Sequence, residues 1–203
     1  MVLEGLACRY RIAGSGRKQI FSFHVPGDIP DLQSLHIDVM DHNLSVVVAS
    51  KIAFIPHATL RTFLRQHPRV ADVFWRDTLI EAAIFREWIA NVGGREARSR
   101  MAHVFCEMYV RLRATNAIDE HTYEFPFPIT QAEMGYALGL SAVHVNRTLQ
   151  SLRRDGFITH HRSTIVIEDW PALQELGEFD STYLHLRKKQ TASARPGPDS
   201  RYV

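Results

Sequence analysis

The stretch ITQAEMGYALGLSAVHVNRTLQSLRR, residues 129–154, constrains the fold more than any other part of the 203-residue chain. Thr130 is followed three residues later by Glu133, a spacing that indicates a capping box and predicts the start of a helix directly after Thr130. Gly139 can supply the positive φ that ends such a helix, and Ser141 is a good N-cap for another. The stretch therefore predicts two short helices joined by a tight turn.

The second of these helices has two contrasting faces. Val145, Leu149 and Leu152 recur at helical spacing and are expected to face the core, with Thr148 leaning inward. Gly135 is expected to leave room where the second helix crosses the first. The opposite side is short at its start and polar further on, which suits a helix in the major groove, where arginine reads guanine and asparagine reads adenine. A DNA-binding helix-turn-helix is favoured over an ordinary helical hairpin. The outward face consists of Ala142, Val143, Asn146, Arg147 and Gln150.

Positive charge around this motif supports DNA as its partner, although the whole chain has a formal charge of only +2. Residues 141–163 carry four arginines against one acid, together with three histidines. Ser141 and His144 suit phosphate contacts, and the strand–turn–strand pattern around HHRS is typical of a wing. Arg153 and Arg154 fit a solvated helix end equally well, because cations are favourable there.

Residues 1–56 have the composition of short β-strands. The runs LACRYRI, QIFSFHV, LSVVVAS and KIAFIP are rich in β-branched and aromatic residues, and turn-forming sequences separate them. Several short strands at this spacing predict a small barrel or sandwich. Further along, YEFPFPI at 123–129 has strand-like content, and GFITHHRSTIVIEDW contains two short strands.

A helical period replaces the strand pattern from about Ala58. Apolar residues recur at spacings of three and four as far as Trp88, with Pro68 in the first turn and Gly93-Gly94 at the end. The predicted helix, roughly 20 residues long, favours a coiled-coil-like contact with a second copy, and packing within one chain is the alternative. The expected dimer interface consists of Val73, Phe74, Ile80, Ile84 and Trp88.

A further helix is predicted over 95–114, with a set of apolar residues on one face. The apolar face of the further helix comprises Met101, Val104, Phe105, Met108, Tyr109 and Leu112. Residues 187–203 have few apolar side chains and are expected to form a disordered tail.

Cys8 and Cys106 are too few and too far apart for a disulfide framework or a four-thiolate metal site. No apolar run of about 18 residues and no signal peptide is present, so a cytoplasmic protein without a membrane partner is expected.

Taken in order, these features resemble the Crp/Fnr superfamily of bacterial transcription regulators, in particular a subgroup common in alphaproteobacteria. The most specific pieces are FHVPGDIPDL, MDHN, FREWIANVGGREARSRMAHVFCEMYVRL and LGLSAVHVNRTLQSLR. The resemblance implies an α+β fold with a cyclic-nucleotide-binding-like β-roll over 1–66, a dimerisation helix over 67–94 and a winged helix-turn-helix over 95–186. Relatives usually have some tens of residues before the piece that matches VLEGLACRY, and these form the first part of the roll. Either the roll is truncated here or Met1 is not the biological start.

The resemblance also implies a function: a sequence-specific transcriptional regulator, not an enzyme, that binds palindromic promoter sites on double-stranded DNA as a homodimer and acts on RNA polymerase. The alternative is a truncated member that serves as a protein–protein interaction module or heterodimer partner, with weak or lost DNA binding. Many relatives carry Arg-Glu at the first two reading positions, so their half-site preference does not transfer to this chain. Matched by position, the base-reading residues are Ala142, Val143, Asn146 and Arg147. The matched DNA-backbone contacts are Thr130, Gln131, Ser141, His144, His161 and Arg162.

The residues that would hold an effector depart from the family pattern. Relatives that bind cyclic AMP carry Gly-Glu and Arg-Ser pairs, whereas the matching positions here are Gly27-Asp28 and about His42-Asn43. Cyclic AMP is therefore not expected, since a buried phosphate requires a charge partner, and no cofactor is assigned. Two cysteines cannot supply the four thiolates of an iron–sulfur cluster. A haem held by His24, His36 or His42 stays open. A metal site is a weaker explanation than ordinary loop residues for the cluster His24, Asp28, Asp31, His36, Asp38, Asp41 and His42.

Overall fold

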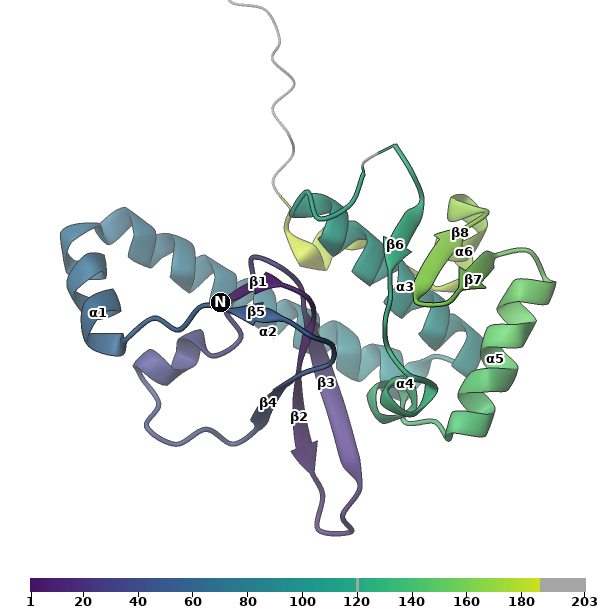
Figure 1. Cartoon of the computed structure of the whole chain (residues 1–203), viewed down its shortest axis with the longest axis horizontal. Coiled ribbons are helices and arrows are strands. Elements are labelled where there is room, and N and C mark those ends of the chain that lie inside the picture. Colours follow the sequence, from purple (N-terminus) through teal and green to yellow (C-terminus); the bar gives the residue numbers. More distant parts are fainter. Residues whose placement is uncertain (120, 187–203) are drawn as a thin grey trace, which may run out of the picture.

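The computed structural model describes residues 1–119 and 121–186, so the predicted tail at 187–203 lies outside the described residues. The N-terminal part contains a three-stranded antiparallel sheet in the order β3–β2–β4 and a separate two-stranded pair of β1 and β5 (Figure 1). Its long hairpin pairs Ala7 with His24 and Ile12 with Lys18, and its register shifts between Arg9 and Tyr10. The strands are β1 (Val2–Glu4), β2 (Ala7–Ile12), β3 (Lys18–His24), β4 (Asn43–Val46) and β5 (Lys51–Ile52), with a 3₁₀ turn η1 (Leu32–Leu35) between β3 and β4.

The predicted strands at the end of this part are shorter than expected. β4 ends at Val46, and only two residues of KIAFIP, Lys51 and Ile52, belong to a strand. The chain then forms a helix of its own, α1 (His57–Gln66), before the long helix α2 (Pro68–Gly94). The two helices are separate because a proline at 68 cannot continue the helix before it but fits the first turn of the next.

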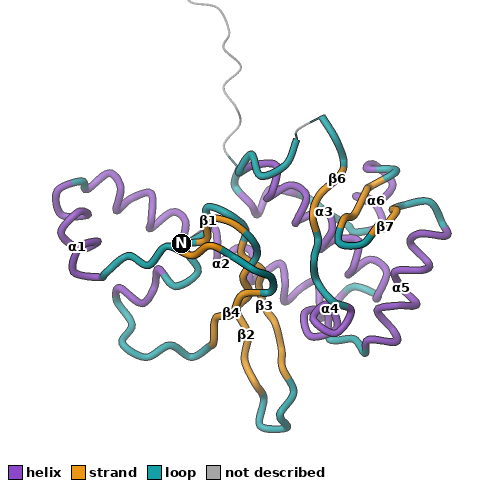
Figure 2. The backbone as a smooth tube through the Cα atoms, viewed as in Figure 1, coloured by secondary structure: helices purple, strands orange, loops and turns teal. Residues whose placement is uncertain are grey.

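The C-terminal part folds around α3, against which the helix-turn-helix and a small sheet are packed (Figures 1 and 2). The sheet is antiparallel in the order β6–β8–β7. Helix α6 was not predicted from the sequence. Its N-cap is Asp169, whose carboxylate accepts a hydrogen bond from the Ala172 backbone N–H at 3.0 Å. The elements are α3 (Ala97–Ala114), β6 (Glu124–Pro126), α4 (Gln131–Leu138), α5 (Ala142–Arg154), β7 (Ile158–His161), β8 (Thr164–Ile167), α6 (Trp170–Leu176) and η2 (Ser181–Leu184).

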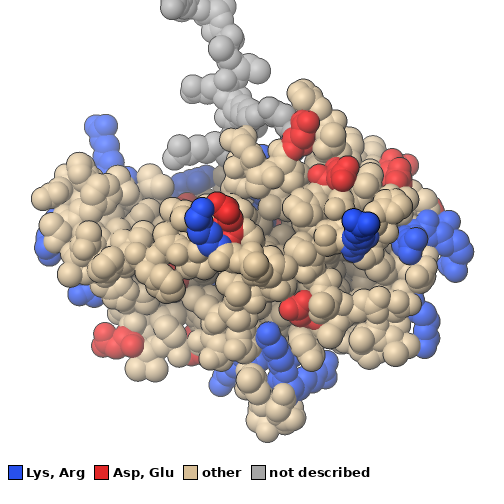
Figure 3. Space-filling view, in the orientation of Figure 1, with Lys and Arg blue, Asp and Glu red and all other residues tan. Residues whose placement is uncertain are grey.

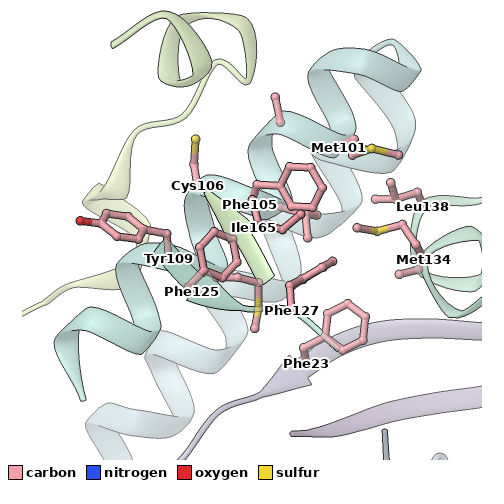
Figure 4. Close-up of a cluster of buried hydrophobic side chains, with 14 of the residues drawn as sticks. Phe23, Met101, Phe105, Cys106, Tyr109, Phe125, Phe127, Met134, Leu138 and Ile165 are labelled. Carbon is pink, nitrogen blue, oxygen red and sulfur yellow. The ribbon is translucent and has the colours of Figure 1, made fainter. Parts of the chain in front are cut away.

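The core is centred on α3, which is buried on almost every side. The six apolar residues predicted for one face are buried as expected, and α3 buries His103, Glu107 and Arg111 as well. Figure 4 shows α3 contributing Phe105 and Met101 to the same cluster of side chains as the sheet and α4. A helix that packs against α2, α4, α5, α6 and β6 leaves little surface to solvent, so most of its polar side chains must find partners inside the protein.

Those partners form a buried ionic network between the N-terminal loop and the C-terminal part. Arg111 donates to Asp28 at 2.7 Å and to Glu107 at 3.0 Å. The fully buried Glu107 also accepts from the indole N–H of Trp88 at 3.1 Å and from the hydroxyl of Tyr183 at 2.8 Å. Burial works against ionisation of Asp28, but Arg111, aided by His24, holds the pKa of its carboxyl below the ordinary value.

The outward face of α2 differs from the face predicted to contact a second chain. Ile84 and Trp88 are buried inside this chain, where the Trp88 ring packs against Phe23 at 5.7 Å between centroids. The prediction is corrected for these two residues, since they already pack within the monomer. Val73 is exposed, and Phe74 and Ile80 are half-buried. The side chains that face outward are Trp75, Leu79 and Ile89, with Ala82, Phe85 and Val92 half-buried beside them.

No helix within the described residues is both long enough and apolar enough to cross a membrane.

Candidate nucleic-acid interface

The first helix of the motif, α4, starts at the predicted capping box. The Thr130 hydroxyl oxygen accepts from the backbone N–H of Glu133 at 3.2 Å, and the Glu133 carboxylate accepts from the backbone N–H of Thr130 at 2.9 Å. These reciprocal bonds satisfy two of the backbone donors that a helix start leaves open. The predicted start of the helix is confirmed.

The turn between the two helices depends on two glycines. Gly139 has φ +68°, the left-handed conformation expected for the residue that ends α4. A Cβ at Gly135 would lie 2.6 Å from the carbonyl oxygen of Leu140, whose own N–H donates to the Gly135 carbonyl at 3.0 Å. The space at Gly135 is therefore required by the turn backbone rather than by the second helix itself, which corrects the expectation in that detail.

Alanine at position 135 is expected to destabilise the protein by about 1–3 kcal/mol, because a Cβ there would overlap backbone that cannot move without opening the turn. The measurement is the free energy of unfolding by chemical denaturation. Gly94→Ala is the matched control, since a Cβ at Gly94 meets nothing within 4 Å. Equal effects of the two substitutions would show that the close approach in the turn is unimportant.

The second helix, α5, is fixed by its cap and by its buried face. The Ser141 hydroxyl accepts from the backbone N–H of His144 at 3.2 Å, which confirms Ser141 as the N-cap. Val145, Leu149 and Leu152 are buried as predicted, and Thr148 is buried with its hydroxyl donating to the His144 carbonyl at 2.9 Å. Around a cavity of only about 30 Å³, α5 meets Met101, Phe105, Met134 and Ile165. The helix is thus held from behind by α3, α4 and the sheet.

The predicted base-reading residues all lie on the exposed face of α5. Ala142, Asn146 and Arg147 are exposed, and Val143 is 64% exposed. The side chains of Asn146 and Arg147 make no hydrogen bond or ion pair within the described parts of the chain. An apolar side chain of this kind can contact the thymine methyl group, while amide and guanidinium groups can each make paired hydrogen bonds to a base.

The wing is a β-hairpin beside this helix. β7 and β8 pair Ile158 with Ile167 and His161 with Thr164, so the turn lies at Arg162 and Ser163. Arg162 has φ +55°, and the Ser163 carbonyl accepts from the backbone N–H of Phe127 at 2.6 Å. The sequence prediction of two strands around HHRS is confirmed.

The six residues predicted to contact the DNA backbone are likewise exposed. They differ in whether their side chains already form hydrogen bonds within the chain. The hydroxyl groups of Thr130 and Ser141 are used in the helix caps, and Thr130 also donates to the Glu133 carboxylate at 2.8 Å. The side chains of Gln131, His161 and Arg162 make no hydrogen bond or ion pair within the described residues. His144 offers its ring near the start of α5.

The surface formed by α5 and the wing is positively charged. Asp155 is the one acidic residue between positions 141 and 163, and it is paired with arginines. Asp155, at the end of α5, accepts from Arg98 at 2.7 Å and from Arg154 at 3.3 Å. Arg147, Arg153 and Arg162 are exposed without an ion pair in the described part of the chain. In the space-filling view, lysine and arginine side chains are prominent on the α5 side and at the lower edge of the molecule (Figure 3).

Supporting residues behind the motif were not found from the sequence. Arg100 of α3 donates to the last carbonyl of α4, that of Leu138, at 2.6 Å and to the Arg95 carbonyl at 2.9 Å. Arg98 stacks over Phe157 at 5.7 Å from the ring centroid. An arginine in a predicted helix carries no pattern that distinguishes such a role from solvation, so only the structure could reveal it.

The residues that the resemblance matches to effector positions make contacts within the chain. Asp28 is bound to Arg111, and His24 donates or accepts at 2.9 Å with Ser22. Burial lowers the pKa of His24, which favours its neutral form. His42 pairs with the neighbouring Asp41 at 2.7 Å. Across residues 1–119 and 121–186, no three side chains of the histidine, cysteine or acidic type gather in a way that could hold a metal ion.

The geometry of α4, α5 and the β7–β8 hairpin defines a winged helix-turn-helix protein. A profile of the Crp-like helix-turn-helix domain matches residues 99–176. The transcriptional activator protein FnrL of Cereibacter sphaeroides is 25% identical over 189 residues, which is 89% of this chain and 73% of that protein. The nitrogen fixation regulation protein FixK of Azorhizobium caulinodans is 24% identical over 177 residues, with 87% and 70% covered.

Solved structures show the same fold. FixK2 from Bradyrhizobium japonicum superposes with a TM-score of 0.72 at 22% identity, covering 87% of this chain and 85% of that one. A CooA mutant from Carboxydothermus hydrogenoformans gives a TM-score of 0.66 at 14% identity, covering 87% and 77%. Residues 99–176 therefore match a Crp-like helix-turn-helix domain, and the chain is similar over most of its length to the FnrL and FixK regulators.

Proposed function

We propose that the protein regulates transcription as a cytoplasmic homodimer that binds a palindromic DNA site, with α5 of each chain in the major groove. The observation that carries the proposal is the division of α5 into a face locked in the core and a face of unpaired Asn146 and Arg147. A helix held this rigidly can read bases with the side chains it leaves free. Contact with RNA polymerase is proposed from the family alone.

The outward face of α2 supports two copies in this assembly. Trp75, Leu79 and Ile89 are exposed along one side of a 27-residue helix. Exposed apolar patches of this kind usually mark interaction sites. Beside them, a groove of about 750 Å³ runs between α2 and the β2–β3 hairpin, lined by Phe85, Ile89 and Val92 on the helix side. A second α2 is the occupant we propose for this groove.

Selection of bound duplexes from a random DNA library tests the proposal, followed by a salt titration on the selected site. We expect a palindrome whose half-sites lie about one helical turn apart, with a steep linear fall of log K against log salt. Weak binding that is insensitive to salt would contradict the proposal and favour a protein–protein interaction module.

Arg147→Ala should weaken binding to the selected site by about 1–3 kcal/mol and relax the preference at one base position, because an arginine that reads a base contributes on that scale. Arg154→Ala is the control, since Arg154 lies at the far end of α5 and contacts Asp155. A repeated selection with each variant measures the change. An unaltered motif with Arg147→Ala would exclude Arg147 as a base-reading residue.

A further inference from the structure

The β2–β3 hairpin is a cationic segment in the N-terminal part of the chain. Residues 5–27 contain four basic side chains and no aspartate or glutamate. Arg9 is buried and paired with Glu81 at 2.9 Å, so its charge is neutralised within the protein. Arg11 and Arg17 are exposed, and Lys18 lies over the Tyr10 ring at 4.2 Å from its centroid. The hairpin therefore presents net positive charge to solvent.

The same hairpin lies against the helix-turn-helix. The side-chain amide of Gln19 donates to the carbonyl of Ala137 in α4 at 3.5 Å. Next to this contact is a hollow of about 500 Å³ between the hairpin and the motif. Arg17 lines it from the hairpin. The motif lines it with Ala132, Gly135, Tyr136, Leu140, Ser141 and Ala142.

Arg17 is the charged residue among those that line this hollow. Within the described residues its guanidinium has no hydrogen bond and no ion pair, and it lines the same hollow as Ser141 and Ala142, where α5 begins. More than half of protein–DNA hydrogen bonds go to phosphates and sugars. Arginine suits a phosphate because its planar fork can donate two bonds at once.

We propose that the β2–β3 hairpin is part of the DNA interface, with Arg17 binding a backbone phosphate of the strand that passes the start of α5. The proposal rests on the DNA binding described above and extends it beyond the winged helix-turn-helix. It also links the N-terminal sheet to DNA affinity, because the position of Arg17 depends on how the hairpin sits against α4. Phosphate contacts carry no sequence information, so the hairpin adds affinity rather than specificity.

The test compares Arg17→Ala with Arg69→Ala in the full-length protein. Arg69 is also exposed, but it lies at the start of α2, at the other end of the molecule from α4 (Figure 1). Fluorescence anisotropy on the selected duplex and on a scrambled duplex would be recorded over a range of salt concentrations. We expect Arg17→Ala to weaken both duplexes equally, about five- to tenfold at 0.1 M salt, and to reduce the log–log salt slope by about 0.9. Arg69→Ala should leave both unchanged.

Arg17→Lys keeps the charge and should retain most of the affinity and the slope, which separates a phosphate contact from a folding defect. If the wild-type protein binds and Arg17→Ala matches it in affinity and slope, the hairpin is not part of the interface although the proposed function stands. Equal losses in the Arg17 and Arg69 variants would reduce the effect to overall charge and overturn the proposal. Absence of binding by the wild-type protein would refute both.

Discussion

Replacing Arg111 with methionine should lower the free energy of unfolding by about 3–5 kcal/mol, because it leaves the buried Glu107 and the half-buried Asp28 without their cation. Arg111 contacts Asp28 at 2.7 Å and Glu107 at 3.0 Å, and Glu107 is fully buried. Methionine keeps much of the length and apolar bulk of arginine, so the loss reports on charge rather than on a cavity. Chemical denaturation monitored by circular dichroism is the measurement.

Arg86→Met is the control, since Arg86 is an exposed arginine of α2 with no ion pair within the described residues. Adding Glu107→Gln to Arg111→Met should recover part of the lost stability, because it removes one of the uncompensated charges. Two observations would contradict the interpretation: a loss as small as that of Arg86→Met, or a double variant less stable than Arg111→Met alone.

This network also joins three separate elements of the chain. Asp28 belongs to the loop that follows β3, and Arg111 belongs to α3. Trp88 joins α2 to the same Glu107 carboxylate. The loop, α2 and α3 therefore all contact the cluster formed by Asp28, Glu107 and Arg111. A change in any of these three elements alters the surroundings of the other two.

The helix-turn-helix could be predicted almost completely from the sequence because its determinants are local. Thr130, Glu133, Gly139 and Ser141 act within a few residues of their own positions, and their roles depend on backbone hydrogen bonds that any helix end must satisfy. Periodicity then separated the buried Val145 side of α5 from its exposed side. The exposed positions follow directly from that division.

The long helix shows where periodicity was insufficient. A helix with apolar residues on two sides gives the same spacing for either side, and α2 uses the Ile84 and Trp88 side within its own chain. Nothing local distinguishes an intrachain face from an interchain one, because the difference lies in which distant elements cover it. The same reason explains α3, whose polar residues Glu107 and Arg111 are buried only because the N-terminal loop and η2 cover them.

The approach of the hairpin to α4 was equally beyond the sequence. Gln19 and Ala137 are 118 positions apart, and their contact depends on the placement of the whole sheet against the C-terminal part. A stretch of basic residues in a predicted hairpin is ordinarily read as a solvated surface. Only the fold brings Arg17 to the start of α5.

Charge placed on the outward face of α2 should separate the two copies that we propose. Ile89 is 73% exposed, so Ile89→Glu costs little within the monomer but would bury a carboxylate in a helix–helix contact. We expect a monomer in sedimentation velocity experiments. We also expect affinity for the full palindrome to fall by about 10²–10⁴-fold, because the second half-site loses its effective concentration.

Binding to an isolated half-site distinguishes loss of the dimer from damage to the exposed face of α5. The half-site affinity of Ile89→Glu should equal that of the wild-type protein. Val39→Glu is the matched control, because Val39 is an equally exposed apolar residue of the loop before β4, away from α2. If Ile89→Glu remains dimeric at concentrations where the wild type is dimeric, then α2 does not pair the chains through this face. The groove of about 750 Å³ beside it would then be available to some other occupant.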